Sequence, residues 1–490
     1  MTAHDKPGPR VSRNCGNCRS VKRRCDRQRP HCGQCIRLRE RCPGYRDEWE
    51  LVFRNDTDKT IKRVKEKKAK TTATPNIAPP TCSLSPRVDD LGVNYFVRHF
   101  VIGGRADARG CLNYIPSIYH ADGEQSTLVA SMSAVGLVAL ANASQHPELA
   151  SHARAKYLEA IRNVNAALAC PVESIKDSTL MSVISLGIFE HVSAYESWAR
   201  HVRGAAALLV ARGKSQFSTP VAIRMFNQVR KDLVIVCFRS DEAFPEEILE
   251  LQEEAARYTD TSTSAWIMGV LSTRCVTVLT KVRENMYKVG FPWIGILDEA
   301  SLLARDFEDL AAVLAVQEPY LVTRMPDLDS DMVPNGVYAV FKDAWAIRLW
   351  SNQRTLQMVV YEIIYWILVK ILSTDLEAAI RDQMKVKLHR TMHTLSKLGD
   401  DILAIAPQAM ELVCCSAPKS GPPFGLSVQG SVSGGYLMTW GLFMIAKSAA
   451  PKPETRKCAI RLLQDIGRNT GMSVALHLVQ IAIEICQKMG

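Results

Sequence analysis

Apolar side chains recur at helical intervals through most of the chain beyond residue 88. In residues 197–212 they repeat every three or four positions, and Gly213 follows as a C-capping residue, which predicts an amphipathic helix. Residues 356–372 present a wider apolar surface that only Glu362 and Lys370 interrupt. Residues 127–143 carry no charge and are rich in Ser, Ala and Gly, which is typical of a buried helix.

We find no sequence signal for β-strands in this region. We find neither sustained alternation of apolar and polar residues nor an Asn-Gly hairpin signal, so we expect residues 89–490 to be all-helical. About 400 residues bury a substantial core as one unit or two packed lobes. The apolar runs are too short or too polar for a bilayer, and we expect no membrane span.

Six cysteines near the N-terminus repeat one spacing twice. They are Cys15, Cys18, Cys25, Cys32, Cys35 and Cys42. Each half has the spacing C-x2-C-x6-C, and six residues separate the halves. A pattern this regular predicts a single metal-binding unit.

Coordination arithmetic indicates how many ions the six thiolates hold. A closed structural zinc site takes four ligands, and thiolate is a favoured donor. Two ions need eight ligand positions, so two of the six sulfurs must bridge both metals. The repeat makes Cys15 and Cys32, the first cysteine of each half, the natural bridging pair. The other four cysteines are then terminal ligands.

Two other readings of the cysteines stay open at this point. A disulfide framework requires an oxidising compartment, whereas the N-terminal residues lack the apolar segment of a secretory signal. A single-zinc ribbon uses four cysteines and leaves the regular six-residue spacings without a purpose. We therefore favour the two-zinc cluster.

The positive charge of the chain is concentrated around these cysteines. Residues 1–70 hold 21 Lys and Arg against 9 Asp and Glu, a net charge of +12. The whole chain carries +11, which leaves −1 for the remainder. A basic module joined to a near-neutral body is typical of a protein that binds nucleic acid.

Residues 15–42 closely resemble the binuclear zinc cluster of fungal Zn2Cys6 transcription factors. The likeness includes the basic run between the second and third cysteines, Asp26 directly after the third, and Pro30 in the loop between the halves. The resemblance implies a small α-type domain whose first helix reads a CGG triplet in the major groove of double-stranded DNA. Lys22 matches the main base-contacting lysine of the family. Val21 departs from a commoner lysine, so one contact is expected to be missing.

The other cations of this segment receive supporting roles. Arg19 and Arg24 are expected to contact base edges or phosphates. Arg23, Arg27 and Arg29 are expected to contact phosphates, which position a protein without reading sequence. A solvated basic face that offsets the negative cluster is the alternative.

The helical region also resembles, more loosely, the fungal-specific regulatory domain of the same family. The likeness rests on residues 198–213 and 462–476. It implies an all-α body that receives a signal or contacts the transcription machinery or co-regulators. Trp198, His201 and Arg212 attract attention as site residues, but core or capping roles are the simpler interpretation.

These patterns predict five segments. They are a disordered tail (1–14), the zinc domain (15–42), a basic arm (43–70), a Pro/Thr/Ser-rich linker (71–88) and a helical regulatory domain (89–490). The strongly basic end of the arm, 59–70, suits phosphate contacts or nuclear import. No heptad pattern is sustained after the zinc domain, so a homodimer, if formed, uses a short or distant contact.

The sequence therefore predicts a nuclear, zinc-dependent transcription regulator of RNA polymerase II genes that holds two zinc ions. An alternative is a receptor-type regulator whose helical body binds a small molecule. An enzyme is disfavoured because we find no catalytic constellation. Residues 425–429 begin like a nucleophile elbow but end in Gln429 where a glycine belongs.

Overall fold

The computed structural model describes most of the chain outside the predicted linkers. The described residues are 14–28, 30–45, 87–103, 109–122, 126–193, 197–240, 242–288, 290–324, 336–412 and 432–489. The chain divides into two compact units. Most of the predicted tail, the end of the basic arm, the linker up to residue 86 and residues 425–429 lie outside the described residues.

The small unit contains the six cysteines and two short helices. These are α1 (Gly16–Ser20) and α2 (Gly33–Arg37). All the cysteines except Cys25 are buried, and Tyr45 packs against them. The core of this unit consists of sulfur atoms, with no large aliphatic side chain among its buried described residues.

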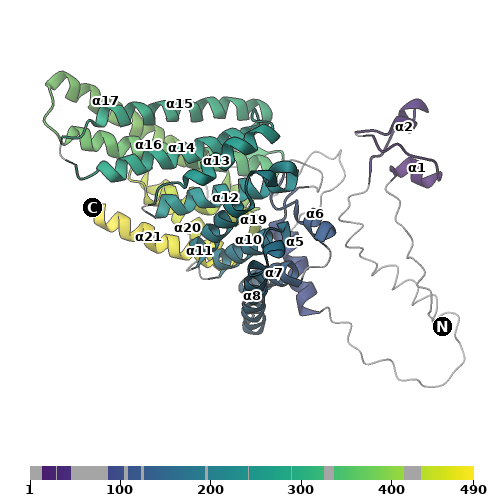
Figure 1. The fold of residues 1–490 in the computed structure, drawn as a ribbon. Coiled ribbons are helices and arrows are strands. Elements are labelled where there is room, and N and C mark those ends of the chain that lie inside the picture. Colours follow the sequence, from purple (N-terminus) through teal and green to yellow (C-terminus); the bar gives the residue numbers. More distant parts are fainter. Residues whose placement is uncertain are drawn as a thin grey trace, which may run out of the picture. The chain divides into compact units, whose positions relative to one another are not determined.

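The large unit is mostly helical, as predicted, and its first half surrounds one fully buried helix. Its elements are α5 (Val88–Phe100), α6 (Ile115–Asp122), α7 (Ser126–Ser144), α8 (Pro147–Leu168), α9 (Pro171–Ser174), α10 (Asp177–Val192), α11 (Trp198–Arg212), α12 (Pro220–Arg239) and α13 (Glu246–Ala255). Every residue from Ser178 to Val192 of α10 is buried. Helices α7, α8 and α11 pack around it, together with α21 (Ser473–Met489) from the end of the chain (Figure 1).

The second half adds long helices that pack side by side. They are α14 (Ser264–Asn285), α15 (Trp293–Gln317), α16 (Ala344–Leu372), α17 (Ala378–Leu403), α18 (Ala406–Ala409), α19 (Val432–Lys447), α20 (Pro453–Asn469) and α21 (Ser473–Met489). Figure 1 shows α14, α15, α16 and α17 as neighbouring rods. One apolar core runs through the unit.

The three helices predicted from the pattern are confirmed. Residues 198–212 form α11, which ends at Gly213 with φ 68°. Residues 356–372 are the second half of the longer α16. The uncharged run 127–143 forms α7, most of which is buried.

The expectation of no strands is wrong at one place. Strands β1 (Tyr320–Arg324) and β2 (Val337–Phe341) pair antiparallel, with Tyr320 opposite Phe341. Both segments are rich in β-branched and aromatic residues. An Asn-Gly pair does precede β2 in the sequence, but residues 325–336 separate the two strands, so this pair is not the two-residue hairpin turn that such a signal predicts. Strands of five residues are too short for alternation to be evident.

Helices α5 and α7 cross at two glycines. A Cβ on Gly136 would lie 1.8 Å from the carbonyl oxygen of Gly92 and 2.9 Å from the backbone nitrogen of Phe96. A Cβ on Gly92 would lie 2.6 Å from the carbonyl oxygen of Ser133. The backbones therefore touch, and only glycine permits this distance.

Three helices are long and apolar enough, by length and composition alone, to cross a membrane. They comprise Thr127–Ser144, α14 and α16, and 67%, 50% and 44% of their most apolar windows are buried within the protein. Part of their apolar surface thus packs inside the helical body. The absence of a membrane span stays a prediction.

Candidate metal centre and DNA-binding surface

Four of the six thiols of the small unit lie close together. The Sγ atoms of Cys15, Cys18, Cys32 and Cys35 all lie within 4.8 Å of one another, and Cys25 and Cys32 form a second group with Asp26. Zinc–sulfur bonds of about 2.3 Å in a tetrahedron place sulfurs about 3.8 Å apart. The close Sγ–Sγ separations are 3.5 Å, 3.7 Å and 3.8 Å. The cysteines therefore fit zinc coordination.

Both helices begin in the same way, because the two halves of the sequence repeat. The Sγ of Cys15 accepts a hydrogen bond from the backbone N–H of Cys18 at 3.5 Å, at the start of α1. The Sγ of Cys32 accepts one from Cys35 at 3.3 Å, at the start of α2. Each turn brings the two cysteines of a C-x2-C pair to one side.

Both helices also end alike, each with a basic residue in the left-handed region. Lys22 has φ 51° and Arg39 has φ 53°. The amide of the following residue donates back to the cysteine inside the helix, at 2.7 Å in the first half and 2.9 Å in the second. Glycine is the usual residue at this place in such a helix end, so both cations occupy strained positions.

The protein environment raises the pKa of the two predicted bridging thiols and lowers the pKa of the terminal thiol Cys42. Burial raises the pKa of Cys15 well above its ordinary value and that of Cys32 to about 12. Backbone N–H groups of Cys32 and Gly44 lower the pKa of Cys42 to about 6. A metal ion that binds the central pair therefore has to displace their protons.

The loop between the halves is fixed by residues that the sequence argument did not assign to the site. Oδ1 of Asp26 accepts from the backbone N–H groups of Gly33 at 3.0 Å and Gln28 at 3.3 Å. The Tyr45 hydroxyl donates to the carbonyl oxygen of Gln28 at 2.7 Å. A Cβ on Gly33 would lie 2.4 Å from the Asp26 carboxylate. The glycine that follows Cys15 and Cys32 in both halves was the available signal.

Comparison with protein families identifies this segment. Residues 13–49 match the family model of the fungal Zn(2)-Cys(6) binuclear cluster domain. This segment is a Zn(2)-Cys(6) domain. No curated protein and no solved structure matches the chain. The domain indicates zinc-dependent DNA binding and transcription regulation, and it is typical of regulators rather than enzymes. The match does not extend to the helical body, whose assignment as a fungal regulatory domain stays a prediction.

One predicted phosphate contact of the Zn(2)-Cys(6) domain forms an ion pair within the domain instead. Arg23 forms an ion pair with Glu40 at 2.6 Å, and its guanidinium also reaches the Sγ of Cys35 at 3.8 Å. Arg23 lowers the pKa of Glu40 in turn. This pair joins the two halves across the cluster, so a structural role accounts for Arg23 without DNA.

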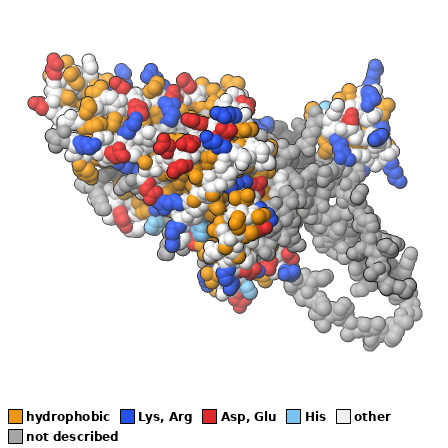
Figure 2. All heavy atoms as spheres, viewed as in Figure 1, with side chains coloured by type: hydrophobic (Ala, Val, Ile, Leu, Met, Phe, Trp, Pro, Cys, Tyr) orange, Lys and Arg blue, Asp and Glu red, His pale blue; other side chains and the backbone are white. Residues whose placement is uncertain are grey.

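The other predicted DNA contacts differ in exposure. Lys22, Arg24 and Arg27 are exposed, and no carboxylate partner is found for them among the described residues. Arg19 is half-buried and donates to the carbonyl oxygen of Asn14 at 3.5 Å. Figure 2 shows Lys and Arg side chains projecting from the small unit. Their contacts with DNA stay predictions, and Arg29 lies outside the described residues.

Trp198, His201 and Arg212, the possible site residues of the helical body, have contacts within that body. The Tyr157 hydroxyl lies 2.9 Å from Nε2 of His201 and donates to Glu190 at 2.6 Å. Arg212 pairs with Asp177, and Trp198 is buried. These contacts tie α8, α10 and α11 together, as expected of core and capping residues.

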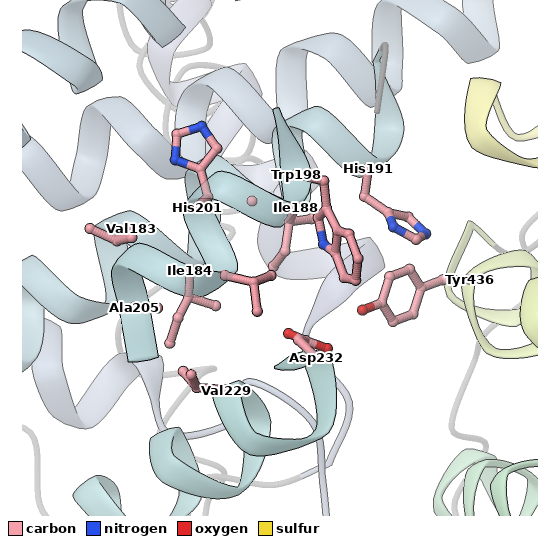
Figure 3. Close-up of a pocket in the computed structure, with 12 residues that line it drawn as sticks. Val183, Ile184, Ile188, His191, Trp198, His201, Ala205, Val229, Asp232 and Tyr436 are labelled. Carbon is pink, nitrogen blue, oxygen red and sulfur yellow. The ribbon is translucent and has the colours of Figure 1, made fainter. Parts of the chain in front are cut away.

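A cavity beside these residues is too small for an effector. Figure 3 shows His191, Trp198, Asp232 and Tyr436 around it, contributed by α10, α11, α12 and α19. Its volume is about 10 Å³. A single water needs at least that much space. The cavity in this conformation therefore gives no support to the small-molecule receptor alternative.

Proposed function

We propose that this protein is a nuclear regulator of RNA polymerase II genes whose Zn(2)-Cys(6) domain holds two zinc ions and reads CGG-like triplets. The observation that carries the proposal is the pairing of sulfur atoms across the two halves. The basic surface of the domain supplies the DNA contacts. The helical body then couples this module to the transcription machinery or co-regulators.

The sulfur pairs support two ions that share two ligands. The close pairs are Cys15 with Cys32, Cys15 with Cys35, and Cys18 with Cys32. Each pair joins one half to the other, and each includes the first cysteine of a half. If Cys15 and Cys32 bridge, every one of these pairs contacts a common ion. Separate sites within each half would instead shorten Cys15–Cys18 and Cys32–Cys35.

The exposure and position of Lys22 support its assignment to the bases. Its backbone, with φ 51°, does not distinguish it, because Arg39 ends the second helix in the same left-handed conformation. Lys22 stands exposed directly after α1 and without an ionic partner among the described residues. A lysine ammonium there suits the N7 and O6 acceptors that guanine presents in the major groove.

The remaining arginines of the domain are the candidates for contacts with DNA phosphates. Arg24 and Arg27 are exposed on either side of Cys25, and Arg27 also has a left-handed backbone with φ 60°. We assign Arg24 and Arg27 to phosphate contacts, and we give Arg19 the same role. Arg23 takes a different role, because its ion pair with Glu40 would have to break before it could reach DNA.

Replacement of Lys22 distinguishes its role in DNA base recognition from its effect on the stability of the domain. We expect Lys22→Gly to stabilise the domain, because glycine relieves the strained backbone, yet to weaken binding to the preferred site by about 1–3 kcal/mol. Competition binding with the preferred and scrambled duplexes measures the loss of preference.

The matched control is Arg39→Gly, at the equivalent place of the second half. This change relieves the same strain and should leave the base preference intact. A uniform loss across all sequences for Lys22→Gly would show that Lys22 contacts phosphate only.

A further inference from the structure

The outer edge of strand β1 presents a row of backbone groups for which no hydrogen-bond partner is found among the described residues. On the other edge of the sheet, the N–H of Ala339 donates to the carbonyl oxygen of Ala404 at 2.8 Å. Gln408 donates to the carbonyl oxygen of Phe341 at 2.9 Å and accepts from its N–H at 2.6 Å. The outer edge of β2 is therefore closed by α18 and the end of α17.

The register identifies which groups of β1 point outward. Ala339 and Phe341 direct their backbone groups away from β1, and they stand opposite Val322 and Tyr320. In an antiparallel pair, residues opposite each other share this orientation. Tyr320, Val322 and Arg324 thus present N–H and C=O groups away from β2. No described residue accepts from or donates to them.

Apolar side chains are exposed on β1 and at the end of the helix before it. Val316 of α15 is 83% exposed, and Leu321 and Val322 of β1 are 74% and 65% exposed. No other large aliphatic side chain among the described residues is more exposed than the first two. Proteins usually protect an open edge with a short strand, charged side chains, proline, a bulge or a covering element. Strand β1 has five residues and carries Arg324 at its end, but no proline, bulge or covering element is found on this edge among the described residues.

We propose that β1 pairs with β1 of a second copy of this chain, so that a continuous four-stranded antiparallel sheet joins the two helical bodies. The proposal does not rest on the reading of DNA by the zinc domain. It assigns a dimer contact to a chain in which no coiled coil is evident.

The strand is self-complementary in this arrangement. A two-fold axis at Val322 places the outward groups of Val322 against those of its own copy, and Tyr320 against Arg324 of the other. All three residues then donate and accept hydrogen bonds. The strand's one charged residue, Arg324, meets an aromatic residue, and the two arginines lie at opposite ends.

Charge exchange at position 322 tests the contact in the full-length protein. We expect light scattering after size exclusion to show about twice the chain mass of 54.5 kDa at tens of micromolar protein. Val322→Lys and Val322→Glu should each give the monomer mass, because like charges then face each other across the axis. An equimolar mixture of the two variants should recover the dimer.

A proline variant tests whether the dimer depends on backbone hydrogen bonds of the β1 edge rather than on the side chain at position 322. Val322→Pro removes an outward N–H and fixes φ at an edge position where proline is tolerated, and it should also abolish the dimer. Val322→Thr keeps that N–H and should retain it. Circular dichroism verifies that each variant is folded.

Three results would overturn the proposal. They are a monomeric wild type, a dimer that survives Val322→Pro, and a charge-exchange mixture that stays monomeric. A wild-type monomer would instead leave the edge to a strand of another protein.

Discussion

Replacing Cys32 by alanine is expected to release both zinc ions and abolish DNA binding. Cys32 is fully buried, and its Sγ lies 3.5 Å from that of Cys15 and 3.7 Å from that of Cys18. In the proposed cluster Cys32 bridges both ions, so its loss removes a ligand from each. Zinc binding supplies on the order of 10 kcal/mol to the folding of small metal domains. The small unit buries little besides its cysteines, so it should unfold. Zinc content per chain and binding to duplex DNA measure the result.

Two controls make this result specific. Cys275→Ala removes an equally buried thiol from α14 and should leave both the zinc content and DNA binding unchanged. Cys18→Ala removes a terminal ligand and should leave Cys32 able to hold the other ion. Loss of only one ion from Cys32→Ala would contradict the bridging assignment.

Replacing Gly136 by alanine should lower the stability of the helical body by about 3 kcal/mol. The new methyl group would lie 1.8 Å from the carbonyl oxygen of Gly92, and neither backbone can move without separating α5 from α7. Thermal unfolding followed by circular dichroism measures the shift. Zinc content should not change, because the cysteines belong to the other unit.

Gly204→Ala is the control with the opposite sign. Gly204 is exposed in α11, and its nearest neighbour would be Val183 Cγ1 at 4.0 Å. Alanine there should raise stability by about 0.5–1 kcal/mol, because glycine is the poorer helix former. If Gly136→Ala left the melting temperature unchanged, the close crossing of α5 and α7 would be wrong.

The cysteine site was predictable because metal coordination restricts sequence directly. Four ligands per ion and a fixed bond length make spacing informative, and the convergence of Cys15, Cys18, Cys32 and Cys35 agrees with that prediction. Long helices such as α7 and α11 were predictable for a similar reason, since one apolar period extends over many residues.

Other features depend on contacts that local pattern does not encode. In the sequence Arg23 is one more cation of a basic run. In the structure it forms an ion pair with Glu40, seventeen residues away. The glycines at 92 and 136 become important only when α5 and α7 cross. The hairpin at Tyr320–Phe341 combines two five-residue strands joined by a long connection, residues 325–336, so neither strand alternation nor a two-residue turn signal marks it in the sequence.

Selection of binding sites from a random duplex pool tests the central claim most directly. The full-length, zinc-loaded protein is the bait, and the Cys32→Ala chain is the matched control. We expect enrichment of CGG-like triplets by the wild type and none by the control. Enrichment of paired triplets would agree with a dimer. If the wild type enriched no sequence beyond the control, the zinc cluster would not be a sequence reader and the proposed function would be wrong.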